Sequence, residues 1–80
     1  MTGRTKRDAL KRVLAQAHHH CDLALEDLLY LKEQFNPSHP ELADGLQMGM
    51  ELIRHSQEII ETFALVAWNM QKDVFDAYRE

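Results

Sequence analysis

Apolar side chains recur at alternating intervals of three and four residues along two segments of the chain, which are separated by a single break. In the first segment the repeat holds at eight positions, which are Leu10, Leu14, Ala17, Cys21, Ala24, Leu28, Leu31 and Phe35. In the second it holds at eleven, of which Gly49 and Ser56 are small rather than apolar: Leu42, Leu46, Gly49, Ile53, Ser56, Ile60, Phe63, Ala67, Met70, Val74 and Ala77. We call these two sets the seams. A repeat near 3.5 residues predicts two long helices, and the period of two that is typical of strands does not occur in the sequence.

The break between the seams is the run Asn-Pro-Ser-His-Pro-Glu at positions 36–41. Pro37 disfavours helical geometry at the residue before it, so the first helix is expected to end there. Ser38 and Glu41 have the spacing of a capping box, which is a signal for the start of a helix. We therefore expect a first helix over about 5–35, a turn at 36–41 and a second helix over about 39–79.

A connection this short makes the two helices antiparallel neighbours, so the sequence predicts a single all-α domain over 1–80, an antiparallel helical hairpin. A hairpin has no enclosed interior, because each seam covers only one side of the other helix. We therefore expect it to associate, either with a second copy as a four-helix bundle or with another helical protein.

Apolar residues outside the seams suggest where this association occurs. One group lies near the turn and the other near the open end of the hairpin, so the two cannot cover each other within one chain. They would meet in an antiparallel homodimer, in which the turn end of each hairpin packs on the open end of the other. The predicted interface residues are Leu25, Leu29 and Tyr30 on the first helix, and Leu65, Trp68 and Phe75 on the second.

Charge is divided unevenly along the chain, whose net charge is −4. Residues 1–12 carry five basic side chains against one acidic side chain, and the rest of the chain carries four basic and twelve acidic ones. One interpretation is that the basic end pairs with Asp73, Asp76 and Glu80 at the other end of the hairpin. The alternative is a nucleic-acid-binding dimer that contacts phosphates through its N-terminus. The basic residues concerned are Arg4, Lys6, Arg7, Lys11 and Arg12.

Three histidines at 18–20, followed by Cys21 and Asp22, raise the question of a metal site. Successive residues of a helix point about 100° apart, so adjacent histidines cannot close on one ion. A site would need both helices, and the candidates that the hairpin brings together are His18, Cys21, His55 and Glu58. The favoured interpretation is surface histidines around a core cysteine, with no metal and no cofactor.

Other function classes find little support in the sequence. Ser38 lies in the turn and Ser56 in a seam, and there is no glycine-rich phosphate loop, so neither an enzyme nor a small-molecule substrate is expected. The longest run without a charged residue is 62–71, about half of what a membrane span needs. With a single cysteine and no apolar leader, we expect a cytoplasmic protein.

The Pro37-Ser38-x-Pro40 turn, together with the length of the chain, resembles small helical-hairpin components of bacterial type III secretion needles. The apolar stretch 59–70 is similar in organisation to that of the short co-chaperones that hold needle subunits before export. The polar mid-helix typical of needle subunits is missing here, which favours the co-chaperone. In overall plan the chain also resembles Rop, an RNA-binding protein whose helical hairpins form a four-helix bundle. These resemblances imply a protein-binding chaperone or, alternatively, an RNA-binding dimer, and assign no role to residues outside the turn.

Overall fold

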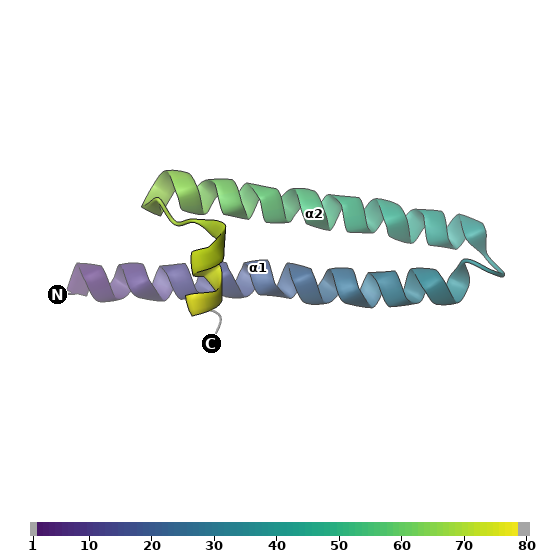
Figure 1. The fold of residues 1–80 in the computed structure, drawn as a ribbon, viewed down its shortest axis with the longest axis horizontal. Coiled ribbons are helices and arrows are strands. Elements are labelled where there is room, and N and C mark those ends of the chain that lie inside the picture. Colours follow the sequence, from purple (N-terminus) through teal and green to yellow (C-terminus); the bar gives the residue numbers. More distant parts are fainter. Residues whose placement is uncertain (1, 79–80) are drawn as a thin grey trace.

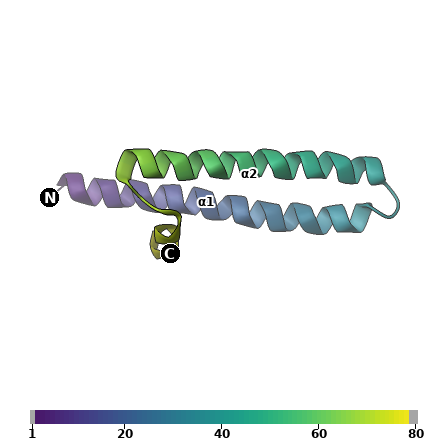
Figure 2. The ribbon, with the colours of Figure 1, turned by 45° about the horizontal axis from the view of Figure 1, so that its top comes forward.

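The computed structural model describes residues 2–78, with all side chains in that range except those of residues 2–5 and 76. Helix α1 (Thr2–Phe35) and helix α2 (Pro40–Trp68) run antiparallel, and a 3₁₀ helix, η1 (Lys72–Tyr78), follows them. Figures 1 and 2 show α1 and α2 side by side along almost the whole molecule, joined by the short turn. The described residues contain no strand. The prediction of an all-α antiparallel hairpin is confirmed.

Helix α2 begins at Pro40 without the capping box that Ser38 and Glu41 predict. The residue before the helix is His39, whose side chain makes no capping hydrogen bond. The hydroxyl of Ser38 instead lies 3.0 Å from Nδ1 of His39. The backbone closes the turn, because the N–H of His39 donates to the carbonyl of Phe35 at 2.7 Å. Pro40 lies in the first turn of α2, where its missing N–H removes no helical hydrogen bond.

Helix α2 ends at Trp68, and the prediction that it continues to about residue 79 is wrong. Asn69 adopts the left-handed conformation, with φ 50° and ψ 38°. Its N–H donates to the carbonyl of Leu65 at 2.9 Å, and the N–H of Met70 donates to the carbonyl of Ala64 at 3.1 Å. Asparagine tolerates this backbone conformation better than most residues do, so it can end a helix as glycine often does.

Beyond Asn69 the chain turns back, and η1 lies across α1 instead of extending past its N-terminus (Figures 1 and 2). This reversal builds the main core of the hairpin. Phe75 is only 2% exposed and is buried with Ala64 and Met70. Its ring meets the ring of His18 edge to face, with 4.7 Å between centroids. The partly buried side chains around this core are Leu14, Ile60, Trp68 and Tyr78.

The contact between α1 and α2 is rotated from the seam of α2. The buried residues of α2 are Ala43, Gln57 and Ala64, and each follows a seam position by one residue. One residue is about 100° around a helix, so much of the seam turns away from the contact. The large apolar seam residues of the two helices that are left 39–53% exposed are Leu10, Leu31 and Phe35 of α1, and Leu42 and Phe63 of α2.

Candidate interaction surfaces

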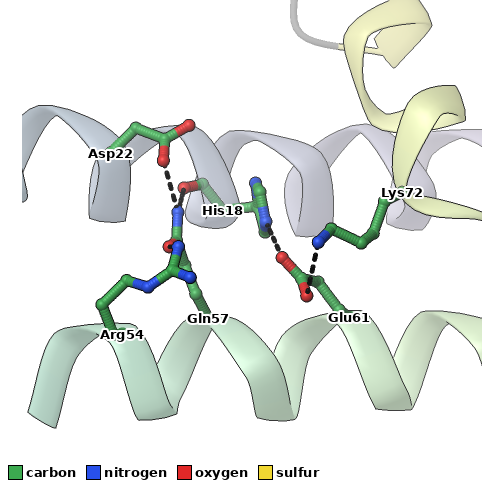
Figure 3. Close-up of polar contacts among 6 residues, drawn as sticks. All are labelled: His18, Asp22, Arg54, Gln57, Glu61 and Lys72. Carbon is green, nitrogen blue, oxygen red and sulfur yellow. Dashed lines mark hydrogen bonds and ion pairs between the residues drawn. The ribbon is translucent and has the colours of Figure 1, made fainter. Parts of the chain in front are cut away.

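Gln57 connects the two helices at the centre of a polar network (Figure 3). Its side chain is 1% exposed, and Nε2 donates to the carbonyl of His18 at 3.1 Å and to Oδ1 of Asp22 at 2.6 Å. The guanidinium of Arg54 donates to the amide oxygen of Gln57 at 3.4 Å. A buried amide needs such partners, and a one-turn slip of the helices would remove them. The network therefore fixes how α1 and α2 align.

Glu61 extends this network to the C-terminal segment (Figure 3). One carboxylate oxygen lies 2.7 Å from Nε2 of His18, and the other lies 3.8 Å from Nζ of Lys72. The side chains of His18 and Glu61 are 14% and 19% exposed, whereas Lys72 is largely in solvent. The short contact thus belongs to the helix pair, and the longer one is a weaker attachment of the segment that carries η1.

The four candidate metal ligands do not form a site. His18 is engaged by Glu61, while His55 and Glu58 line a groove on the surface. Cys21 is half-buried, and burial together with the carboxylate of Asp22 raises the pKa of its thiol. Among the residues that the structure describes, no three histidine, cysteine, aspartate or glutamate side chains are grouped so as to hold a metal ion.

An open groove of about 580 Å³ lies between the helices. We call it the central groove. Its apolar residues are Leu25 and Leu29 of α1 and Met50 of α2, and its other lining residues are Glu26, Gln47, Glu51, Arg54, His55 and Glu58. Two of the three predicted interface residues of the first helix therefore share one hollow. The third, Tyr30, is well exposed and is not among the lining residues.

The predicted interface residues of the second helix differ in environment. Leu65 is about half exposed, beside the segment that leads into η1. Trp68 is half-buried and meets the ring of Phe63 edge to face, with 5.6 Å between centroids. Phe75 fills the core of its own chain. The fold-back therefore supplies, within one molecule, part of the cover that the sequence assigned to a second copy.

The four most exposed large apolar residues of α2 form a line that sequence reasoning missed. Met48, Leu52, Ile59 and Val66 are 57–80% exposed. Their intervals of four and seven residues place them on one face of the helix, opposite the buried Ala43, Gln57 and Ala64. We call this line the outer stripe. Its spacing is present in the sequence, but the longer repeat of the seam favours a different face as the apolar one.

The basic end of α1 projects past the end of α2 (Figure 1). Lys6, Arg7 and Arg12 are exposed, and Arg7 and Lys11 line a shallow hollow with residues 66–69. The C-terminal carbonyls of α2 favour positive charge there. None of these four side chains forms an ion pair with a described residue.

The predicted pairing of the two ends of the chain is therefore not observed for the side chains that the structure describes. Asp73 is exposed and makes no ion pair with a described residue. The side chains of Arg4 and Asp76, and the whole of Glu80, lie outside the described part of the chain.

No protein-family model, curated protein or solved structure matches the chain. Within residues 2–78, neither long helix has the length and apolar character needed to cross a bilayer. The features of the molecule that bear on function are therefore the central groove, the outer stripe and the basic end of α1.

Proposed function

We propose that this chain is a non-catalytic helical hairpin that works by protein–protein contact, self-associating or holding a helical partner. One observation carries the proposal. Among the described residues, fifteen large hydrophobic side chains are exposed, whereas the buried apolar core consists of five residues, three of them alanines. Exposed apolar residues aligned along a helix are typical of surfaces that bind another protein.

The geometry favours a helix as the partner. The outer stripe presents apolar side chains at the four- and seven-residue intervals by which two helices recognise each other. Burying the exposed parts of its four side chains would contribute roughly 4–8 kcal/mol, at about 1.5–3 kcal/mol for a fully buried side chain. Association itself costs about 4–15 kcal/mol. The outer stripe alone therefore binds weakly, and a stable complex also has to use the exposed seam residues or the central groove.

A more specific proposal is that the chain is a small chaperone or adaptor related to secretion. It is supported by the Pro37-Ser38-x-Pro40 turn and by a second helix that exposes apolar side chains to a partner. Such a protein holds an amphipathic helix that would otherwise aggregate. We propose a cytoplasmic location for it, where a lone cysteine such as Cys21 stays reduced.

Two matched variants test the proposal. Leu52→Glu places a charge within the outer stripe of α2, and Gln34→Glu adds the same charge at an exposed position of α1. We expect Leu52→Glu to lower the solution mass of the purified chain over a dilution series, or to abolish retention of lysate proteins on the immobilised chain. Gln34→Glu should behave as the unmodified protein does. The proposal is contradicted if two results occur together. The unmodified chain is monomeric at every concentration, and the immobilised Leu52→Glu variant retains the same lysate proteins as the unmodified chain.

The exposed basic end of α1 supports a second candidate, a nucleic-acid-binding dimer similar to Rop. Lys6, Arg7 and Arg12 are exposed and form no ion pair with described residues, and the N-terminal end of α1 projects past α2 (Figure 1). Binding through phosphates would fall with salt, with a slope of about 0.7–0.9 per phosphate contacted. The measurement is a gel-shift titration with mixed DNA and RNA at low salt. A complete absence of any shift removes this candidate.

A further inference from the structure

The central groove combines an apolar surface with acidic side chains and is open in this chain. Leu25, Leu29 and Met50 provide apolar contacts from both helices. Glu26 of α1 and Glu58 of α2 add carboxylates, and neither forms a hydrogen bond or an ion pair with a described residue. A third glutamate also lines the groove, which contains a single arginine. Its chemistry suits a helix that carries apolar side chains among basic ones.

One segment of the same chain has that composition. Residues 6–13 of α1, which we call the N-terminal arm, contain Leu10 and Val13, respectively 49% and 61% exposed. The basic residues of the arm are Lys6, Arg7, Lys11 and Arg12. The arm lies at the N-terminal end of α1, where Arg7 and Lys11 line a hollow with residues 66–69 at the C-terminal end of α2. The arm and the central groove are therefore complementary in charge, and both have uncovered apolar side chains.

The arm cannot reach the groove of its own chain. Both lie on the continuous helix α1, and about 18 residues separate their centres, which is roughly 27 Å at 1.5 Å per residue. A contact between them therefore requires two molecules. A surface that matches a hollow elsewhere on the same molecule leads to association of copies, either as a closed pair or as a growing chain.

We propose that the central groove of one copy binds the N-terminal arm of a second copy. Leu10 and Val13 pack against Leu25, Leu29 and Met50, and the basic side chains of the arm lie beside the glutamates of the groove. This inference rests on the proposed function as a protein-contact module and identifies one partner of that module. The contact has a large electrostatic component, so it weakens as salt is added, unlike a contact made by the outer stripe alone.

Charge reversal tests the contact from both sides. Lys6→Glu/Arg12→Glu alters the arm, and Glu26→Lys/Glu58→Lys alters the groove, at positions that are all exposed. Glu33→Lys/Asp44→Lys is the matched control, because it makes the same change in net charge as the groove variant at exposed acidic residues outside the groove. Circular dichroism verifies that each variant keeps its helices. Sedimentation velocity then measures self-association at low and at high salt.

We expect the arm variant and the groove variant each to associate at least tenfold more weakly than the unmodified chain, and the control variant to associate normally. An equimolar mixture of the arm variant and the groove variant should form a complex, because one unaltered arm then meets one unaltered groove. The proposal is overturned if the unmodified chain stays monomeric at low salt, if either variant associates normally, or if the mixture forms no complex. Normal association of both variants would leave the proposed function intact, since the outer stripe and the exposed seam residues of α2 are unchanged in them.

Discussion

Replacing Gln57 tests whether a polar contact, rather than an apolar one, holds α1 and α2 in register. The side chain is almost completely buried and donates to the carbonyl of His18 and to the carboxylate of Asp22. Gln57→Ala removes both hydrogen bonds and leaves two acceptors on α1 without this donor. A double-mutant cycle with Asp22→Ala isolates the part of the loss that belongs to the bond between the two side chains.

The magnitude can be worked out from the two bonds. A hydrogen bond to a charged partner contributes about 1.5–3 kcal/mol to stability, and one to a neutral carbonyl about 0.5–1.5 kcal/mol. Gln57→Ala should therefore lower the free energy of unfolding by about 2–4 kcal/mol. The coupling energy between Gln57 and Asp22 should be about 1.5–3 kcal/mol, in line with their 2.6 Å contact. The total free energy of unfolding of a domain of this size is about 4–12 kcal/mol, so the single substitution removes a large part of its stability.

The measurement is urea unfolding of the four proteins of the cycle, followed by helical ellipticity at one fixed protein concentration, because association would stabilise the folded state. Lys32 and Gln47 provide the control, since they join the same helices through a 2.7 Å hydrogen bond in a less buried place. We expect their coupling energy to be below about 1 kcal/mol. A coupling near zero for Gln57 and Asp22, or a loss from Gln57→Ala no larger than that from Gln47→Ala, would refute the reasoning.

Three further predictions concern the C-terminal segment and the cysteine. Phe75→Ala should lower stability by about 3–5 kcal/mol and expose residues 69–78 to protease, while most helical ellipticity remains; unchanged protease resistance would contradict the fold-back. Asn69→Ala should lower the melting temperature, because a left-handed residue costs about 1–2 kcal/mol, whereas Asn69→Gly should not; equal effects would show that the backbone conformation is unimportant. Cys21 should react with iodoacetamide more slowly at pH 8 than a cysteine introduced at the exposed position Gln34, because burial and then Asp22 raise its pKa and lower the thiolate fraction. Equal rates at these two positions would contradict the raised pKa of Cys21.

The ends of the helices show which local signals the sequence carries. Pro37 correctly marked the end of α1, because its effect on the preceding residue needs no tertiary contact. The end of α2 was missed because Met70 and Val74 continue the seam past Trp68. The left-handed conformation of Asn69 breaks the helix in spite of that pattern. The C-terminal segment stabilises this break, since the reversal lets Phe75 enter the core.

The open end shows what an apolar pattern leaves undetermined. Trp68 and Phe75 were recognised as apolar residues that needed cover outside the seam. The sequence could not distinguish cover from a second molecule from cover by a reversal of the same chain. The structure shows the reversal for Phe75, and the intermolecular role of Leu25, Leu29 and Leu65 stays a prediction.

The alignment of the helices also depends on polar contacts that the apolar repeat of the sequence does not predict. The three polar pairs that join α1 and α2 all have residue numbers that add to 79: His18 with Glu61, Asp22 with Gln57, and Lys32 with Gln47. A hairpin aligned by its turn alone would pair residues whose numbers add to about 76. Gln57 lies directly after a seam position and has no apolar character, so no sequence signal marked it as a buried residue.

The contact between α1 and α2 is made by polar pairs and alanines, and apolar seam residues lie partly outside it. The register of the helices and the exposed apolar side chains therefore belong to different faces. Ala43 and Ala64 allow α1 and α2 to approach closely, and Gln57 specifies their register, but small and polar side chains contribute little apolar free energy. Most of the apolar surface of α2 therefore remains available for another molecule. A hairpin built in this way has a defined shape by itself, because contacts within the chain set its register. In the association that we propose, its exposed leucines and phenylalanines supply the apolar free energy that an interaction module needs.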